Sequence, residues 1–199
     1  LELGRYREAI KRRRTGEPTA YILGEREFYG HRFRVDARVL VPRADTETLV
    51  DVALARTRPR SLGGAALDLG TGSGCVAIAF ARQRPTWEVT GVDVEPGAAA
   101  LARENALRLG AWNALRVLVG DLFAPLRPGE RFDLIVGNPP YVRDDEIPHL
   151  MVDVREHEPR RALAGGADGL DLVRRIVAAA PEWLAPGGVL ALEIGCEQG

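Results

Sequence analysis

Residues 66–74 read Ala66-Leu67-Asp68-Leu69-Gly70-Thr71-Gly72-Ser73-Gly74, so an apolar strand runs directly into a glycine-rich turn, and an apolar helical segment follows over residues 75–84. Glycine permits a tight turn and a close approach of the backbone to a ligand, beside the free N–H groups of the helix. A purely steric turn is the alternative interpretation. The turn lacks the Gly-Lys-Ser/Thr of a P-loop, and its Gly-x-Gly-x-Gly spacing favours an adenosine ligand without a pyrophosphate over a nicotinamide dinucleotide.

From residue 65 onward, short apolar segments alternate with helical ones, which is typical of a parallel sheet with crossover helices on its faces. Strands are predicted over residues 66–69, 89–92, 116–119, 132–136 and 189–194, and helices over 75–84, 96–109 and 169–183. The prediction is an α/β fold with an open, doubly wound, mostly parallel sheet. Such sheets bind ligands at the carboxyl ends of the strands, where the strand order reverses.

The part of the chain before residue 57 has a different pattern. Leu3–Arg14 reads as a charged helix that a Gly-Glu-Pro run ends. Residues 28–35 alternate apolar and polar side chains around a glycine, and Val39-Leu40-Val41 follows, so a small β-hairpin is predicted here. Residues 45–56 return to a helical pattern with an apolar face.

Composition narrows the class of partner. With a formal net charge of -1 over 199 residues, the chain has no general excess of positive charge to hold a polyanion, so nucleic acid is not the expected partner. Cys75 and Cys196 lack CxxC spacing and a neighbouring His cluster, so neither a metal site nor a redox pair is predicted. No apolar run is long enough to cross a bilayer and no signal peptide is recognisable, so we expect a cytoplasmic protein without a membrane partner.

Acidic residues follow two further predicted strands. Asp93 is placed to accept hydrogen bonds from both hydroxyls of a ribose, as acidic residues do at this point of nucleotide-binding sheets. Its alternative role is to cap the helix that begins near Pro96. Asp121 lies where it can meet the amino group of an adenine. Leu122 and Phe123 then flank the ring, unless the two belong to the core.

The strand over residues 132–136 delivers Asn138-Pro139-Pro140-Tyr141 to the same edge of the sheet. The two prolines fix the backbone and leave carbonyl groups without local N–H donors. A planar nitrogen can donate its two N–H groups to the Asn138 side-chain oxygen and the Pro139 carbonyl oxygen, while Tyr141 stacks on the amide plane. The alternative is an ordinary tight turn with a buried tyrosine.

Together these motifs resemble the class I S-adenosylmethionine-dependent methyltransferases, whose sheet is Rossmann-like, and the Asn-Pro-Pro-Tyr tetrapeptide narrows the resemblance to enzymes that methylate amino or amide nitrogens. Nearly the whole chain is similar to the release-factor glutamine N5-methyltransferase family. The matching segments are Gly16–Ile22, Glu27–Gly30, Val41–Arg43, Asp45–Glu47, Glu158–Arg160, Gly165–Asp171 and Leu192–Gly195.

The resemblance implies methyl transfer from S-adenosyl-L-methionine to the side-chain amide nitrogen (N5) of the glutamine in the Gly-Gly-Gln motif of peptide-chain release factors, with S-adenosyl-L-homocysteine as product. The residues that the motifs and the resemblance assign to the cofactor are Asp68, Gly70, Thr71, Gly72, Ser73, Gly74, Asp93, Asp121, Leu122 and Asn138. Those assigned to the glutamine are Asn138, Pro139, Pro140 and Tyr141, among which Asn138, Pro139 and Tyr141 are the expected catalytic residues.

The resemblance also implies a division of the chain into three parts. Residues 1–25 are expected to be a linker helix left from an N-terminal helical domain, residues 26–44 a hairpin, and residues 45–199 a methyltransferase domain that the family continues with further strands. The chain departs from the family at two positions. Leu122 stands where the family often has a tryptophan or another large side chain, and Ala44 stands where the family often has a second proline. We expect a monomer.

Three alternatives stay open on the sequence. A DNA adenine N6-methyltransferase shares the tetrapeptide, but 199 residues hold no target-recognition region rich in basic and aromatic residues. A nicotinamide oxidoreductase shares the sheet. A non-enzymatic module that binds a release factor or the ribosome predicts binding without a cofactor and no effect of Asn138→Ala.

Overall fold

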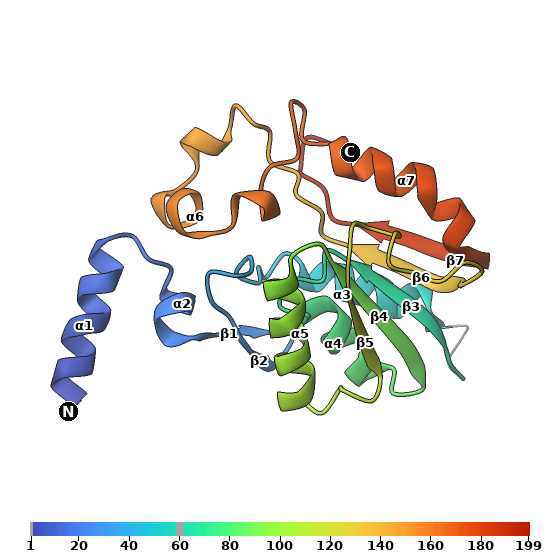
Figure 1. The fold of residues 1–199 in the computed structure, drawn as a ribbon, viewed down its shortest axis with the longest axis horizontal. Helices are drawn as coiled ribbons and strands as arrows, with labels where there is room; N and C mark the ends of the chain where they lie inside the picture. Colours follow the sequence, from blue (N-terminus) through green and yellow to red (C-terminus); the bar gives the residue numbers. More distant parts are fainter. Residues whose placement is uncertain (1, 59–61) are drawn as a thin grey trace.

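The computed structural model describes residues 2–58 and 62–199, and its centre is a five-stranded parallel sheet with helices on both faces (Figure 1). The strands of this sheet are β3 (Gly64–Leu69), β4 (Trp87–Asp93), β5 (Leu115–Val119), β6 (Phe132–Gly137) and β7 (Leu184–Leu192). They lie in the order β5-β4-β3-β6-β7, and each neighbouring pair is parallel. The predicted α/β fold with a doubly wound sheet is confirmed.

Each face of the sheet packs against its own helices, because strand side chains alternate between the two faces. The long helices beside the sheet are α3 (Glu47–Arg56), α4 (Cys75–Gln83), α5 (Pro96–Arg108) and α7 (Asp171–Trp183). Ala66 and Leu134 belong to the apolar cluster that includes α3, α4 and α5. Leu67 and Ile135 point to the other face, where they pack with Ile176 of α7.

The hairpin is shorter than predicted. β1 (Glu25–Phe28) pairs antiparallel with β2 (His31–Arg34) through the turn Tyr29-Gly30, whose φ angles of 51° and 73° suit a two-residue hairpin turn. The prediction that Val39-Leu40-Val41 belongs to the hairpin is wrong, because the tight turn completes the pairing before residue 35. Val39 and Val41 are instead buried against Leu101 of α5.

Five short or peripheral helices complete the fold within residues 2–58 and 62–199. They are α1 (Glu2–Arg14), α2 (Thr19–Leu23), η2 (Ile147–His149), α6 (Val152–His157) and η3 (Arg160–Ala162), and only the first of them was predicted. The last three lie in the long connection between β6 and α7, which Figure 1 shows above the carboxyl edge of the sheet. No helix in the described part of the chain is long and apolar enough to span a bilayer. The division at residues 25 and 44 stays a prediction.

Candidate active site at the carboxyl edge of the sheet

The strand order reverses at β3, which pairs with β4 on one side and with β6 on the other. Leu69 at its carboxyl end lies opposite Val92 of β4 and Gly137 of β6. The loops that follow these strands line a cavity of about 630 Å³, a volume typical of small-molecule sites. Below, this space is called the central cavity; its lining includes residues 68–73, Asp93, Asp121, Leu122, Asn138, Pro139, Pro140, Arg43 and Thr46.

The glycine turn and Asp93 are joined by backbone hydrogen bonds. Gly70, Gly72 and Gly74 have φ angles of 72°, 56° and 80°, which residues with a Cβ rarely adopt. Asp93 accepts the N–H of Gly72 on Oδ2 at 2.8 Å and the N–H of Glu95 on Oδ1 at 2.9 Å. Each carboxylate oxygen can accept a further hydrogen bond. Desolvation raises the pKa of Asp93, and the two backbone donors oppose that shift.

Asp68 lies beneath the glycine turn. Its side chain is almost fully buried and accepts the hydroxyl of Thr71 at 2.8 Å. Burial raises the pKa of Asp68 to about 6, and the hydrogen bond from Thr71 opposes the shift. The hydrogen bond between Asp68 and Thr71 supports the glycine turn from below. Asp68 also lines the central cavity.

The loop after β5 places Asp121, Leu122 and Phe123 in three different environments. Asp121 is exposed and pairs with Arg175 of α7 at 2.6 Å. Phe123 is buried and stacks on Trp183, with ring centroids 5.6 Å apart. Leu122 lines the central cavity with a φ of 49°, a conformation that is unusual for a side chain of its size and that occurs at ligand sites. Phe123 is therefore core, and Leu122 alone of the apolar pair borders the cavity.

The loop after β6 brings Asn138, Pro139 and Pro140 to the central cavity. Gly137 precedes it at a point without room for a side chain, because a Cβ there would lie 2.9 Å from the carbonyl oxygen of Leu69. Two consecutive prolines supply no N–H donor, so the carbonyl of Pro139 is free of competition from them.

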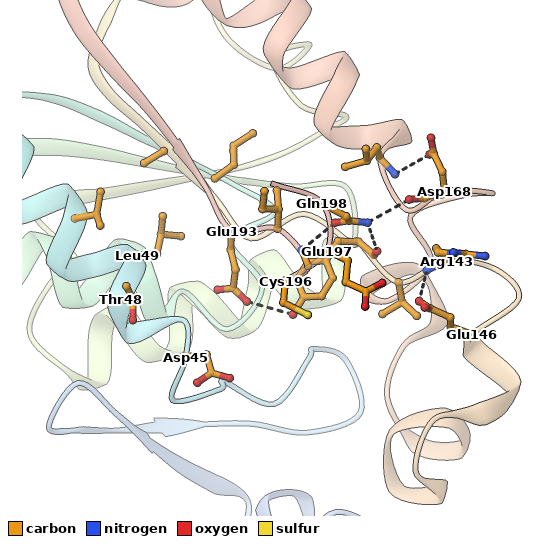
Figure 2. A pocket seen from close by; sticks show the side chains of 18 of the residues that line it. Asp45, Thr48, Leu49, Arg143, Glu146, Asp168, Glu193, Cys196, Glu197 and Gln198 are labelled. Carbon is orange, nitrogen blue, oxygen red and sulfur yellow. Dashed lines mark hydrogen bonds between the residues drawn. The ribbon is translucent and has the colours of Figure 1, made fainter.

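Tyr141 lines a second cavity, of about 1390 Å³, together with residues of β7. Figure 2 shows this cavity, with Glu193 and Gln198 labelled among its lining residues. The Tyr141 hydroxyl donates to Glu193 Oε1 at 3.3 Å, and Gln198 Nε2 donates to the Tyr141 carbonyl oxygen at 3.0 Å. Burial raises the pKa of Tyr141, and the carboxylate of Glu193 adds to that effect. The structure therefore brings three residues of the tetrapeptide to the central cavity and places Tyr141 beside the other, so stacking of Tyr141 on an amide stays a prediction.

An ion pair that sequence reasoning did not assign to the site joins two distant segments at the rim. Arg43 lines the central cavity and pairs with the buried carboxylate of Glu158 at 2.7 Å. Glu158 also accepts the N–H of Val41 at 3.3 Å. Burial raises the pKa of Glu158, whereas the guanidinium of Arg43 lowers it. The signal in the sequence was only the resemblance of both segments to the family, since nothing in their spacing reveals the contact.

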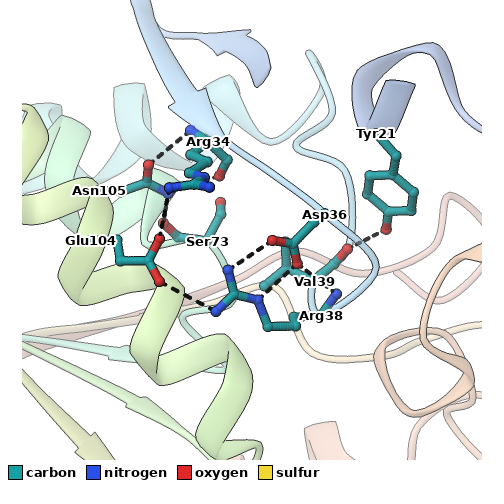
Figure 3. A network of polar contacts seen from close by, with 8 residues as sticks. All are labelled: Tyr21, Arg34, Asp36, Arg38, Val39, Ser73, Glu104 and Asn105. Atoms are coloured by element: carbon teal, nitrogen blue, oxygen red, sulfur yellow. Dashed lines mark hydrogen bonds and ion pairs between the residues drawn. The ribbon is translucent and has the colours of Figure 1, made fainter. Parts of the chain in front are cut away.

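A buried amide connects the hairpin to the glycine turn (Figure 3). Asn105 of α5 is fully buried and accepts the N–H of Arg34 at 2.8 Å. Its Nδ2 donates to the carbonyl oxygens of Arg34 at 3.0 Å and Ser73 at 2.8 Å. Asn105 thus fixes the position of β2 relative to Ser73 in the wall of the central cavity.

Comparison with known proteins identifies the family. Residues 45–157 match the family model described as the methyltransferase small domain. The chain is 51% identical over 197 residues to a release factor glutamine methyltransferase of Geobacter sulfurreducens, with 99% of this chain and 67% of that protein covered. The chain belongs to the release factor glutamine methyltransferase family.

Two further known proteins are similar to the chain. It is 47% identical over 199 residues to a ribosomal protein uL3 glutamine methyltransferase of Bordetella pertussis, with 99% of this chain and 66% of that protein covered. The chain spans about two thirds of the length of these relatives. A Thermus thermophilus 16S rRNA N2 G1207 methyltransferase has a TM-score of 0.58 at 22% identity, with 84% of this chain and 40% of that chain covered, and shares the fold.

As a release factor glutamine methyltransferase family member, the chain is a methyltransferase with S-adenosylmethionine as cofactor, which excludes the oxidoreductase and the non-enzymatic module. The central cavity fits that cofactor. Asp93 presents carboxylate oxygens that can accept hydrogen bonds of the kind ribose hydroxyls donate, and Leu122 presents an apolar surface of the kind that suits an adenine. A Cβ on Gly70 would meet nothing within 4 Å, so the turn leaves open space for the remaining part of the cofactor.

Proposed function

We propose that this chain methylates the side-chain amide nitrogen of the glutamine in the Gly-Gly-Gln motif of peptide-chain release factors. The observation that carries the proposal is that the glycine turn and the Asn138-Pro139-Pro140 loop open into one cavity, in a chain 51% identical to a release factor glutamine methyltransferase. Parallel neighbouring strands place the two loops side by side, since Leu69 of β3 lies opposite Gly137 of β6.

On the donor side, residues 70–74 and Asp93 bind the cofactor. The carboxylate of Asp93, already held by two backbone N–H groups, accepts the ribose hydroxyls without having to rotate. Asp68 supports the turn from beneath, and Leu122 borders the adenine, with Asp121 near its amino group. S-adenosylmethionine supplies the methyl group, and S-adenosylhomocysteine is what remains of it.

On the acceptor side, Asn138 Oδ1 and the carbonyl oxygen of Pro139 accept the two N–H groups of the glutamine amide. An amide nitrogen is a weak nucleophile because its lone pair is delocalised, so catalysis depends on orientation and on the exclusion of water. Asn138 borders both ligands, and Tyr141 closes the acceptor side next to Glu193. No basic side chain is required, because transfer of the methyl group from the sulfonium first gives a cationic N-methylated amide, which is acidic enough to lose its N–H proton to solvent.

The direct test is to incubate the protein with labelled S-adenosylmethionine and a release factor. We expect label in the release factor, no label when the Gly-Gly-Gln glutamine is replaced, and no label with Asn138→Ala. The matched control is Asn113→Ala, an exposed asparagine outside the cavity, which should label like the unchanged protein. Label that persists after replacement of the glutamine would overturn the substrate, and label in added DNA would indicate the adenine N6 alternative.

A second candidate substrate is ribosomal protein uL3, because a uL3 glutamine methyltransferase is 47% identical to this chain over 199 residues. Both enzyme names describe the same chemistry at a glutamine. The two substrates are therefore presented at equal concentration in one reaction. Faster labelling of uL3 would transfer the substrate assignment and leave the site assignment unchanged.

A further inference from the structure

Thr46 is a buried residue whose hydroxyl meets the side chain of Asn138. Its exposed fraction is 3%, and Asn138 Nδ2 donates to Thr46 Oγ1 at 3.1 Å. The two residues are 92 positions apart in the chain, so the contact is made only by the fold. A buried hydroxyl needs a hydrogen-bond partner, and the partner here is the residue that borders both ligands.

Helix capping does not account for this hydroxyl. Thr46 stands at the N-cap position of α3, where threonine commonly accepts an N–H of the first turn, but its side chain makes no capping hydrogen bond. Its backbone φ and ψ of -64° and -17° are helical, which differs from the extended geometry of a capping threonine. The hydroxyl is thereby turned toward Asn138.

The hydrogen bond holds the Asn138 amide in the orientation in which Nδ2 meets Thr46. An asparagine side chain carries one acceptor oxygen and one donor nitrogen, and turning it over exchanges them. With Nδ2 held by Thr46, Oδ1 is the end left for the glutamine N–H groups. The reversed amide would present N–H to N–H and could not hold the substrate.

The position of Thr46 is itself fixed. Its backbone N–H donates to the carbonyl oxygen of Arg43 at 3.2 Å, and Arg43 is held by the buried carboxylate of Glu158. Glu158 also receives the N–H of Val41, so the segment that leads to Thr46 is tied down at two points. These contacts hold the segment before Thr46 firmly against the rim of the central cavity.

We propose that Thr46 is a positioning residue that orients the carboxamide of Asn138 for the acceptor amide. The inference rests on the proposed function in that Asn138 Oδ1 accepts the substrate N–H. It differs from that function in naming a residue that acts through Asn138.

The test compares Thr46→Val, which removes the hydroxyl at nearly constant shape, with Thr46→Ser, which keeps it. The matched control is Thr57→Val. Thr57 lies at the other end of α3, is 2% exposed, and its hydroxyl donates to the carbonyl oxygen of Ala53. We expect Thr46→Val to lower kcat by about 10- to 100-fold with unchanged affinity for S-adenosylhomocysteine. Thr46→Ser and Thr57→Val should stay within about twofold of the unchanged protein.

A second measurement needs no acceptor substrate, so it separates failure of this inference from failure of the proposed function. The side-chain amide signals of Asn138 in a nitrogen-15 correlation spectrum are identified by their loss in Asn138→Ala. We expect them to exchange slowly with solvent in the unchanged protein and in Thr46→Ser, and rapidly in Thr46→Val. Equal exchange in all three, or a Thr46→Val protein with full kcat, would overturn the inference, whereas absent labelling of every glutamine substrate would overturn only the proposed function.

Discussion

Replacement of Asn105 by alanine should destabilise the protein more than any exposed substitution. Asn105 is fully buried in α5 and makes three hydrogen bonds, two with the backbone of Arg34 and one with the carbonyl oxygen of Ser73. Alanine removes all three. Ser73 is itself buried, so its carbonyl oxygen loses the Asn105 donor in a place that water does not readily reach.

The magnitude follows from these contacts. A buried group left without its partner costs about 2 kcal/mol, and each of the two bonds to Arg34 contributes about 1 kcal/mol, so the expected loss is about 4 kcal/mol. Proteins of this size unfold with about 5–15 kcal/mol, so the loss is a large share of the total. Asn105→Asp should cost at least as much, because a carboxylate oxygen would then face two carbonyl oxygens.

Urea unfolding measures this loss as a shift of the midpoint at constant slope. With a slope of about 2 kcal/mol per molar, the midpoint should fall by about 2 M. Asn113→Ala, in the exposed loop after α5, should change the free energy of unfolding by less than about 0.5 kcal/mol. A loss below about 1 kcal/mol for Asn105→Ala would refute the reasoning that this amide joins the hairpin to the glycine turn.

Three further outcomes are expected. Asp93→Asn replaces one of the two side-chain oxygens that accept backbone N–H groups with an NH₂ donor. It should weaken binding of S-adenosylhomocysteine by at least about tenfold in calorimetry, and a change below twofold would speak against ribose binding. Burial raises the pKa of Asp68 to about 6, so the folded state binds more protons than the unfolded state between about pH 4 and pH 6, and stability falls as pH rises through this window. Asp68→Asn should lack that decline in pH-dependent urea unfolding, and parallel curves would contradict the assignment. Glu158→Ala should lower the free energy of unfolding by about 2–3 kcal/mol and Glu158→Gln by less, since glutamine still accepts the N–H of Val41; thermal unfolding that shows equal losses would count against the contact.

The sheet could be predicted from the sequence because each of its strands is a short apolar run next to a turn or a helix. The start of β7 at Leu184 could not, because Pro186, Gly187 and Gly188 read as a loop and yet continue an edge strand. Proline is tolerated at an edge because no partner needs its missing N–H. The short helices between β6 and α7 lack the length that gives a periodic signal.

The candidate site was predictable where a residue follows a strand directly. Residues 70–73 and Asn138 follow a strand directly, Asp93 is the last residue of β4, and all of them line the central cavity. Contacts that depend on packing could not be predicted, such as the pairing of Asp121 with Arg175. The side chain of Tyr141 is a further case, because the tetrapeptide sets the path of the backbone but leaves the direction of the ring to its neighbour Glu193.

Gly137 lies where the two loops of the central cavity meet, with no space for even a methyl group beside Leu69. The backbone hydrogen bonds between β3 and β6 therefore hold the donor and acceptor loops one strand spacing apart, about 4.8 Å, whatever side chains the loops carry. Alignment for methyl transfer then comes from the main chain, and it survives changes in the surrounding loops. A change in the surface that selects the protein substrate would therefore leave the spacing of the two loops unchanged.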